Sequence, residues 1–250
     1  MMKHLLVAVS LATAGAAQAD TFHVTIEAPG VQNSTAAFAF SGVETFDKVG
    51  TGIQSLNTSF GTGGVITGRY SGVEVASANQ YGGAGGAGNF ATTFSSAGYS
   101  LSLATTDPAG INYFGFWLSA LDSGNNLTFS KGGMVVYTFS PADVVALVKS
   151  TPGYLGNPNA PFLGNVGDQA YVFLNFFDTD GTFDMVQFSE SPEIGGYESD
   201  NHTVGFFTRE SGTPINPVPE PASWALMIAG LSLAGSMMRR RTAKVAFASA

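Results

Sequence analysis

Hydrophobic and polar residues alternate over many short stretches of this chain, and alternation with a period of two is the pattern of a half-buried β-strand. Residues 21–27 are the simplest case, because Phe22, Val24 and Ile26 fall on one side. Glycine, serine and asparagine cluster between the stretches, as expected of turns. The sequence therefore predicts an all-β chain. Further strand-like stretches lie at 37–40, 43–46, 65–75, 99–103, 126–130, 134–139, 171–177, 183–188 and 203–208.

The strongest core signal is the stretch 112–122. Its apolar residues from Phe114 to Ala120 alternate along one face, which should point into the core. Tyr113 and Trp117 fall on the opposite face. These two rings either form a platform on which a sugar stacks or are covered in a two-layer sandwich, and we favour the covered arrangement.

Turn and cap residues indicate how the strands connect. Residues 122–125 (Asp-Ser-Gly-Asn) predict a hairpin between the stretches 112–122 and 126–130, and Lys131-Gly132-Gly133 predicts the next turn. Ser140 followed by Pro141 predicts the start of one short helix that ends near Val148. The predicted fold is an antiparallel β-sandwich, jelly-roll-like, with one short helix.

Both ends of the chain carry uncharged hydrophobic runs. Lys3 and His4 precede an apolar run that ends in Ala17-Gln18-Ala19, so residues 1–19 are predicted to be a helical secretory signal, used by the Sec translocon and signal peptidase. Near the other end, residues 222–238 are uncharged and just long enough for a transmembrane helix. The arginines that follow should stay on the cytoplasmic side, which leaves the body outside.

Pro219, Glu220 and Pro221 precede this run, Trp224 lies within it, and Arg239, Arg240 and Arg241 follow it. This tail resembles the PEP-CTERM sorting signal that exosortases recognise. The resemblance implies an exported protein that is held transiently at the inner membrane, cleaved near Pro219, and left at the cell surface or outside the cell. An ordinary C-terminal membrane anchor is the alternative.

These signals divide the chain into five parts. The body is expected to be a single β-sandwich domain, and the stretch rich in proline and polar residues after it reads as a spacer. The predicted parts are a signal peptide at 1–19, a β-sandwich domain at 20–211, a linker at 212–218, the sorting signal at 219–241 and a cytoplasmic tail at 242–250.

The composition of the body excludes some classes of partner and site. Seventeen acidic and five basic residues give residues 20–218 a formal charge of −12, so we expect no binding to nucleic acid, which requires basic contacts to phosphate. The chain has no cysteine, so no disulfide can form, and 20 Phe, 8 Tyr and 2 Trp supply a hydrophobic core instead. The glycine-rich stretch 79–89 lacks the helix and the Lys-Ser/Thr of a phosphate loop and is predicted to be a surface loop.

An acidic cluster is the main candidate for a metal site. Asp178, Asp180 and Asp184 surround Gly181, and Asp200 would join them if the strands that carry them pair. Carboxylates on a turning loop suit Ca²⁺, which is the one cofactor the sequence suggests. The alternative, which we favour, is that residues 178–181 form a plain β-hairpin turn, for which Asp-Gly is a standard signal.

Little in the chain supports catalysis. Only His23 and His202 remain in the body, and neither a G-x-S-x-G nor an H-E-x-x-H motif is present, so we predict that the protein is not an enzyme. The stretches 112–122, 178–181 and 198–201 resemble lectin-like β-sandwich domains of other exported PEP-CTERM proteins. We therefore expect a structural or adhesive protein of the surface or extracellular matrix, associated with exopolysaccharide and biofilm. A carbohydrate-binding module is the alternative, and a polysaccharide-active enzyme is a third possibility.

Overall fold

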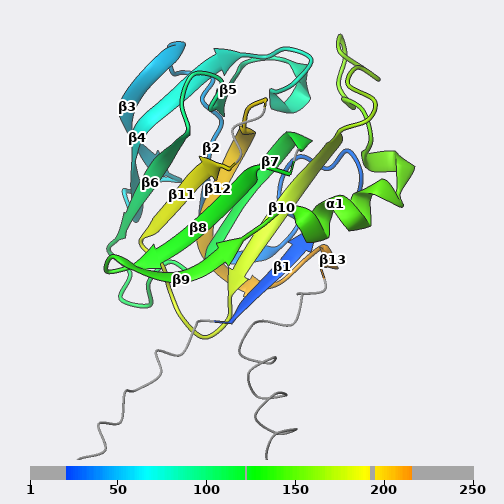
Figure 1. Ribbon diagram of the computed structural model, residues 1–250. Helices are drawn as coiled ribbons and strands as arrows, with labels where there is room; N and C mark the ends of the chain where they lie inside the picture. Colours follow the sequence, from blue (N-terminus) through cyan, green and yellow to red (C-terminus); the bar gives the residue numbers. More distant parts are fainter. Residues whose placement is uncertain (1–20, 122, 192–194, 216–250) are drawn as a thin grey trace, which may run out of the picture.

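The computed structural model describes residues 21–121, 123–191 and 195–215, which form a nearly all-antiparallel β structure (Figure 1). The prediction of an all-β body is therefore confirmed. The strands are β1 (Phe22–Ile26), β2 (Ala37–Glu44), β3 (Gly52–Phe60), β4 (Ile66–Ser77), β5 (Asn89–Thr92), β6 (Gly98–Thr105), β7 (Tyr113–Leu121), β8 (Asn125–Lys131), β9 (Met134–Phe139), β10 (Ala170–Asp178), β11 (Met185–Glu190), β12 (Glu198–Arg209) and β13 (Thr213–Pro214). The helical elements are α1 (Ala142–Lys149) and the short 3₁₀ turns η1 (Ala84–Gly86) and η2 (Pro152–Tyr154).

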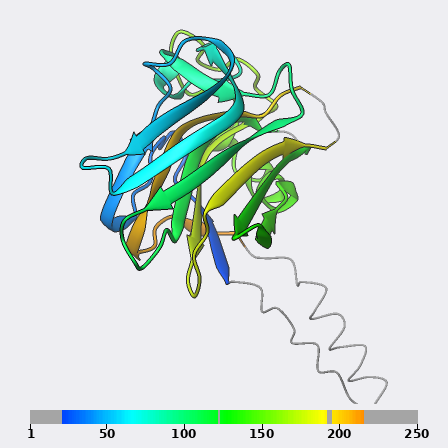
Figure 2. The same ribbon diagram turned by 90° about the vertical axis from the view of Figure 1, so that its left-hand side faces the viewer.

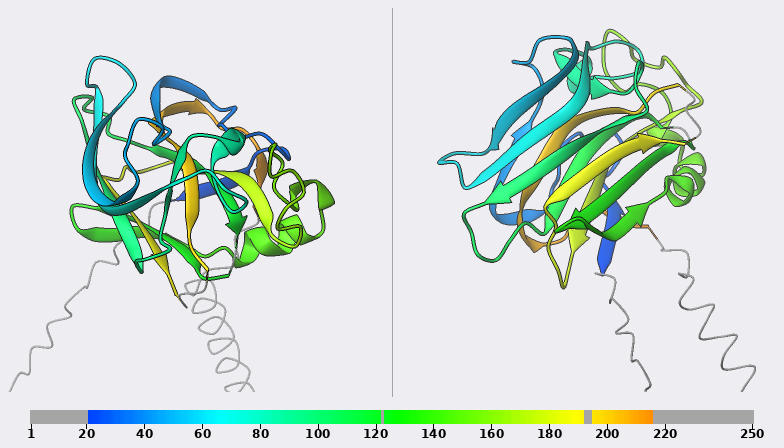
Figure 3. Two further views of the ribbon diagram at one scale, coloured as in Figure 1. Left: turned by 90° about the horizontal axis from the view of Figure 1, so that it is seen from above. Right: turned by 60° about the vertical axis from the view of Figure 1, so that its left-hand side comes forward.

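One continuous sheet curls so that its two halves face each other, as Figures 2 and 3 show. The strand order is β13-β1-β10-β7-β12-β5-β4-β6-β11-β8-β9, while β2 pairs with β12 and β3 with β4. The short strand β5 links the halves, because it pairs with both β12 and β4. Phenylalanine, leucine and valine side chains from both halves fill the space between them. This arrangement gives the sandwich-like core that the alternating pattern predicted.

Strand β7 lies in the middle of one half, between β10 and β12. All nine of its residues are buried. Phe114, Phe116 and Leu118 point into the main core. Trp117 lies on the other face, in a second small cluster with Tyr171 and Phe173. Both faces of the strand are therefore covered, as the favoured interpretation expected.

Two predicted hairpins are wrong. Strand β7 does not pair with β8, since β8 lies between β11 and β9 in the other half of the sheet. Residues 178–181 likewise join β10 to β11, which pair with different strands. A turn motif specifies a local chain reversal, but it does not specify the strand's hydrogen-bonded neighbour. The hairpin from β8 to β9 through Gly132 and Gly133 is present as predicted.

The short helix is also present, one residue later than its cap signal suggested. Pro141 occupies the N-cap position of α1, rather than Ser140, and no side chain caps the helix. Val144 and Val148, four residues apart, are buried against the sheet. The helix therefore covers the core beside β10.

The predicted linker begins later than expected. Residues 213 and 214 pair with Thr25 and Ile26 as β13, and Ile215 is buried, so at least residues 212–215 belong to the folded body. The predicted signal helix at 1–19 and transmembrane helix at 222–238 lie outside the described residues. Within the described ranges, no helix is both long and apolar enough to cross a membrane.

Candidate functional site

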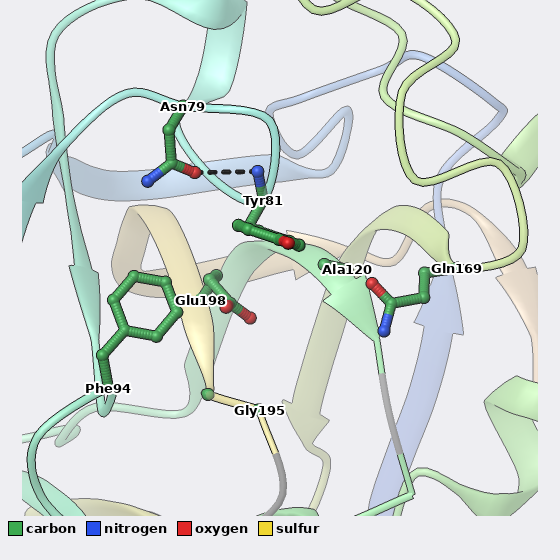
Figure 4. Close-up of a pocket in the computed structure, with 8 residues that line it drawn as sticks. Asn79, Tyr81, Phe94, Ala120, Gln169, Gly195 and Glu198 are labelled. Atoms are coloured by element: carbon green, nitrogen blue, oxygen red, sulfur yellow. Dashed lines mark hydrogen bonds between the residues drawn. The ribbon is translucent and has the colours of Figure 1, made fainter.

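A cleft of about 480 Å³ opens at the end of the domain where β7 stops (Figure 4). Five separate segments supply its walls: the loop after β4, the loop after β5, the end of β7, and the residues that enter β10 and β12. The register of β7 with β10 and of β10 with β1 places Thr21 at the other end of the domain, more than about 20 Å from Ala120 along the sheet. The lining residues are Asn79, Tyr81, Phe94, Ala120, Gln169, Gly195, Gly196 and Glu198.

Two aromatic rings form the rim of the cleft. Tyr81 and Phe94 each expose 41% of their surface, which is unusual in a protein whose other large aromatic residues are mostly buried. Both are held in place. The Asn79 side chain accepts hydrogen bonds from the backbone N–H groups of Tyr81 (2.8 Å) and Gly82 (3.2 Å), and Phe94 packs edge-on against Phe90. The rings are therefore a preformed apolar surface that faces solvent.

The cleft is also lined by one carboxylate and two amide side chains, those of Glu198, Asn79 and Gln169. Glu198, only 4% exposed, contributes a carboxylate, and the shielded Oε1 atom of Gln169 has no hydrogen-bond partner among the described residues. Glycine at position 196 leaves room for the Phe94 ring and the Glu198 carboxylate, because a Cβ there would lie 2.6 Å from the ring and 2.9 Å from Glu198 Oε1. A ligand with an apolar face and several hydroxyl groups would match a lining that combines two aromatic rings with amide and carboxylate groups.

Two β-bulges interrupt the pairing of β7, one near the cleft and one near the middle of the strand. The register between β7 and β10 shifts near Ala120, which has φ +47°, and the register between β12 and β7 shifts near Asn201, which has φ +50°. A positive φ is costly for a residue with a Cβ, by about 1–2 kcal/mol. Such bulges redirect side chains and are common beside binding sites. Ala120 itself lines the cleft.

Asp200 anchors the glycine-rich loop that carries Tyr81. Its carboxylate accepts hydrogen bonds from the backbone N–H groups of Ala84 (2.8 Å) and Asn201 (2.7 Å). The side chain is 3% exposed, and burial raises the pKa of Asp200 to about 7, with a further contribution from the carboxylates of Asp47 and Glu44. The protonation of a buried group is thus coupled to the loop that forms one wall of the cleft.

His202 lies inside the core rather than at a site. It stacks on Phe188 with ring centroids 5.1 Å apart, and its Nδ1 lies 3.0 Å from the Tyr70 hydroxyl. Nε2 has no hydrogen-bond partner in the described structure, and burial lowers the pKa of His202 to about 3. This imidazole is neutral and inaccessible, so it is a core residue.

The predicted sugar platform is not at the surface. Tyr113 and Trp117 are both completely buried, and the Tyr113 hydroxyl donates to Asn175 Oδ1 over 2.7 Å. A sugar cannot reach either ring, because Phe38 of β2 packs edge-on against Tyr113 and Ala84 packs against the cluster that contains Trp117. Among residues 21–121, 123–191 and 195–215, the exposed aromatic residues are Tyr81 and Phe94. No sequence pattern marked them, because each is a single ring in a loop without periodic alternation.

Each of the four predicted calcium ligands already accepts hydrogen bonds from protein groups. Asp178 Oδ1 accepts from the Gly181 N–H, Asp180 accepts from the N–H and hydroxyl of Thr21, and Asp184 Oδ2 accepts from the Gly132 N–H. Asp200 lies about 13 Å farther along the sheet, because its partner on β7 is Trp117 and the partner of Phe177 is Tyr113. Among the described residues, no group of three or more histidines and carboxylates is placed to hold a metal ion.

Comparison with known proteins gives one match, in the tail. No curated protein and no solved structure matches the chain. A model of the PEP-CTERM protein-sorting motif matches residues 217–241, a segment that contains the Pro219-Glu220-Pro221 tripeptide, Trp224 and the arginines 239–241. The all-β body is consistent with a lectin-like sandwich. The chain thus carries a PEP-CTERM sorting motif at its C-terminal end, which marks it as an exported, exosortase-targeted surface protein with a membrane-anchored sorting region.

Proposed function

We propose that the exported body is an adhesive protein of the extracellular matrix, and that it binds exopolysaccharide through the Tyr81–Phe94 cleft. The observation that carries this proposal is the presence of two half-exposed aromatic rings in one cleft with amide and carboxylate side chains. The apolar faces of pyranose rings pack on aromatic side chains, while their hydroxyls donate to carboxylates and amides. Adhesion and carbohydrate binding, which the sequence suggested as alternatives, are here a single function: the protein adheres to the matrix by binding its polysaccharide.

The position of the cleft supports display at a surface. Thr21 and Ile215, where the described chain begins and ends, both adjoin β1, at the end of the domain opposite the cleft (Figure 1). A sorting signal attached beyond Ile215 would therefore leave the cleft facing away from the membrane. Polysaccharide could bind both before and after processing, with biofilm matrix as the expected setting.

The charge of the body limits the class of polysaccharide. Residues 20–218 carry a formal charge of −12, and Glu198 adds a carboxylate within the cleft itself. A polyanionic glycan would meet repulsion in both places. Neutral polymers and those that contain amino sugars are the expected ligands.

The cleft favours binding over catalysis. Most glycosidases use two carboxyl groups on either side of the scissile bond. Among the described residues that line the cleft, Glu198 is the single carboxylate. We therefore propose a protein without hydrolase activity, and incubation with a panel of polysaccharides, followed by a reducing-end assay, tests this directly.

A glycan array, followed by titration calorimetry with the best ligand, tests the proposed function. Tyr81→Ala and Phe94→Ala should each weaken binding about fivefold or more, since each removes a stacking ring worth about 1 kcal/mol. Leu163→Ala is the matched control, because Leu163 is 70% exposed but lies outside the cleft lining. Unchanged affinity in both cleft variants, or no binding to any glycan, would refute the proposal.

A further inference from the structure

The last described residues are clamped onto the first strand of the body. The Thr25 hydroxyl donates to the Ser211 carbonyl oxygen (2.6 Å), and the Ser211 hydroxyl donates to Glu27 Oε1 (2.6 Å). Thr213 and Pro214 then pair with β1 as β13. Finally, the backbone N–H of Ile215 donates to the Val24 carbonyl oxygen (2.9 Å), and the Ile215 side chain is buried. Residues 211–215 are called the clasp below.

Glu27 is the buried residue that holds the clasp through Ser211. Although it is 3% exposed, its carboxylate accepts hydrogen bonds from the Thr35 N–H, the Thr35 hydroxyl and the Asn175 amide in addition to the Ser211 hydroxyl. Burial alone would raise the pKa of Glu27, but these hydrogen bonds outweigh it and lower the pKa below its usual value. The carboxylate is therefore charged at neutral pH and holds Ser211 firmly.

The clasp also depends on glycine at position 212. Gly212 has φ +83°, and a Cβ there would lie 2.6 Å from the Ile26 carbonyl oxygen and 2.7 Å from Thr25 Oγ1. Any other residue would have to adopt an unfavourable backbone conformation and displace β1 atoms at the same time. A single substitution can therefore loosen this segment.

The sorting motif follows the clasp almost at once. The matched segment begins at residue 217, two residues after Ile215, and Pro219 is four residues after it. Four residues span at most about 14 Å even when fully extended. Enzymes that act on a peptide segment commonly bind it as an extended strand of several residues. With the clasp closed, the folded body lies directly against any enzyme that engages the motif.

We propose that the clasp restrains processing, so that the exosortase acts efficiently only when residues 211–215 leave β1 and lengthen the free chain. Opening the clasp releases the chain from Ser211 onward, because Glu210 is held separately by His23. This adds the five residues 211–215 to the three that separate Ile215 from Pro219. The body itself remains folded, since β1 keeps its pairing with β10. This inference rests on the sorting motif and is independent of the polysaccharide proposal.

Pulse–chase measurement of processing in cells that contain the exosortase tests this inference in the full chain. Gly212→Ala should open the clasp, and insertion of Gly-Ser-Gly-Ser between Ile215 and Asn216 should extend the chain while the clasp stays closed. We expect Gly212→Ala to be processed about fivefold faster or more, because about 1 kcal/mol of strain at a positive φ raises the population of the open clasp by that factor. The insertion variant should also be processed faster than the parent, because its chain is longer. Gly132→Ala is the matched control, with φ +56° but nothing within 4 Å of the added Cβ, and should be processed at the parental rate.

Hydrogen exchange at the Ile215 amide reports clasp opening directly, because that N–H donates a hydrogen bond to the Val24 carbonyl oxygen. Faster exchange in Gly212→Ala together with faster processing would support the inference. Faster exchange with parental or slower processing would overturn it. Parental processing of the insertion variant would also overturn it, since that chain reaches farther whether or not the clasp opens.

Discussion

Replacement of Asp200 by asparagine should change how the stability of the body depends on pH. Asp200 is 3% exposed, and burial raises its pKa from 3.8 to about 7. The folded state therefore holds a proton on this carboxyl that the unfolded state has released between these two pH values. Stability from this group is fully present below pH 3.8 and is lost as the pH rises through 7.

The size of the effect follows from the same two pKa values. The gap between 3.8 and about 7 corresponds, at about 1.4 kcal/mol per pKa unit, to a loss of about 4 kcal/mol between pH 4 and pH 8. Asparagine has no proton to lose in this range. The stability of Asp200→Asn minus that of the parent should thus rise with pH by about 4 kcal/mol, with its midpoint below pH 7.

The contribution of Asp200 would not be visible in the pH dependence of the parent's stability alone. The pKa of His202 falls from 6.5 to about 3 on burial, so the stability that it contributes is present above pH 6.5 and is lost as the pH falls through 3. Between pH 4 and 6.5 the two groups act in opposite directions and nearly cancel. The contribution of His202 is common to parent and variant, so it disappears from their difference.

Urea denaturation of the exported body at half-unit steps from pH 4 to pH 8 gives the difference profile. Asp180→Asn is the control, because its carboxylate is exposed and hydrogen bonds from Thr21 lower its pKa. That variant should show no rise in relative stability above pH 5. A flat difference profile for Asp200→Asn would refute the assignment of a buried, proton-binding carboxyl beneath the glycine-rich loop.

Three further predictions follow from buried groups and from the separated aspartates. Trp117→Ala should lower the free energy of unfolding by about 3–5 kcal/mol, measured in urea, and a loss below about 1 kcal/mol would contradict its core role. Glu27→Ala should cost about 3 kcal/mol or more, because it leaves several buried donors unpaired, and a near-parental melting temperature would contradict this. Millimolar Ca²⁺ should leave the melting temperature unchanged, whereas a rise that Asp178→Asn abolishes would restore the calcium hypothesis.

The strands were predictable from sequence because alternation is a local property. The stretch beginning at Phe22 and the apolar run from Tyr171 to Phe177 became β1 and β10, with both faces of β10 buried. The choice of hydrogen-bonded partner strands is not a local property. The turn after β7 looked like a hairpin, but β7 needs two partners in the middle of the sheet, and these come from residues 170–178 and 198–209.

The cleft was less accessible to sequence reasoning than the core. Tyr113 and Trp117 were candidates for a sugar platform because they lie in the stretch with the clearest alternation. Alternation indicates burial, however, and both rings are buried. Tyr81 and Phe94 line one cleft although they come from different loops, and the loop of Tyr81 is held by a buried carboxylate that is distant in sequence, Asp200. The tail is the opposite case, since a linear motif needs no fold to be recognised.

Intact-mass analysis of the protein recovered outside the cell tests the central claim most directly. The account predicts a species that has lost the C-terminal segment, so that it ends near Pro219 and lacks Trp224 and the arginines 239–241. In cells without the exosortase, the same segment should remain attached and the protein should stay with the membrane fraction. Extracellular protein that still carries Trp224 and the arginine cluster would contradict the account.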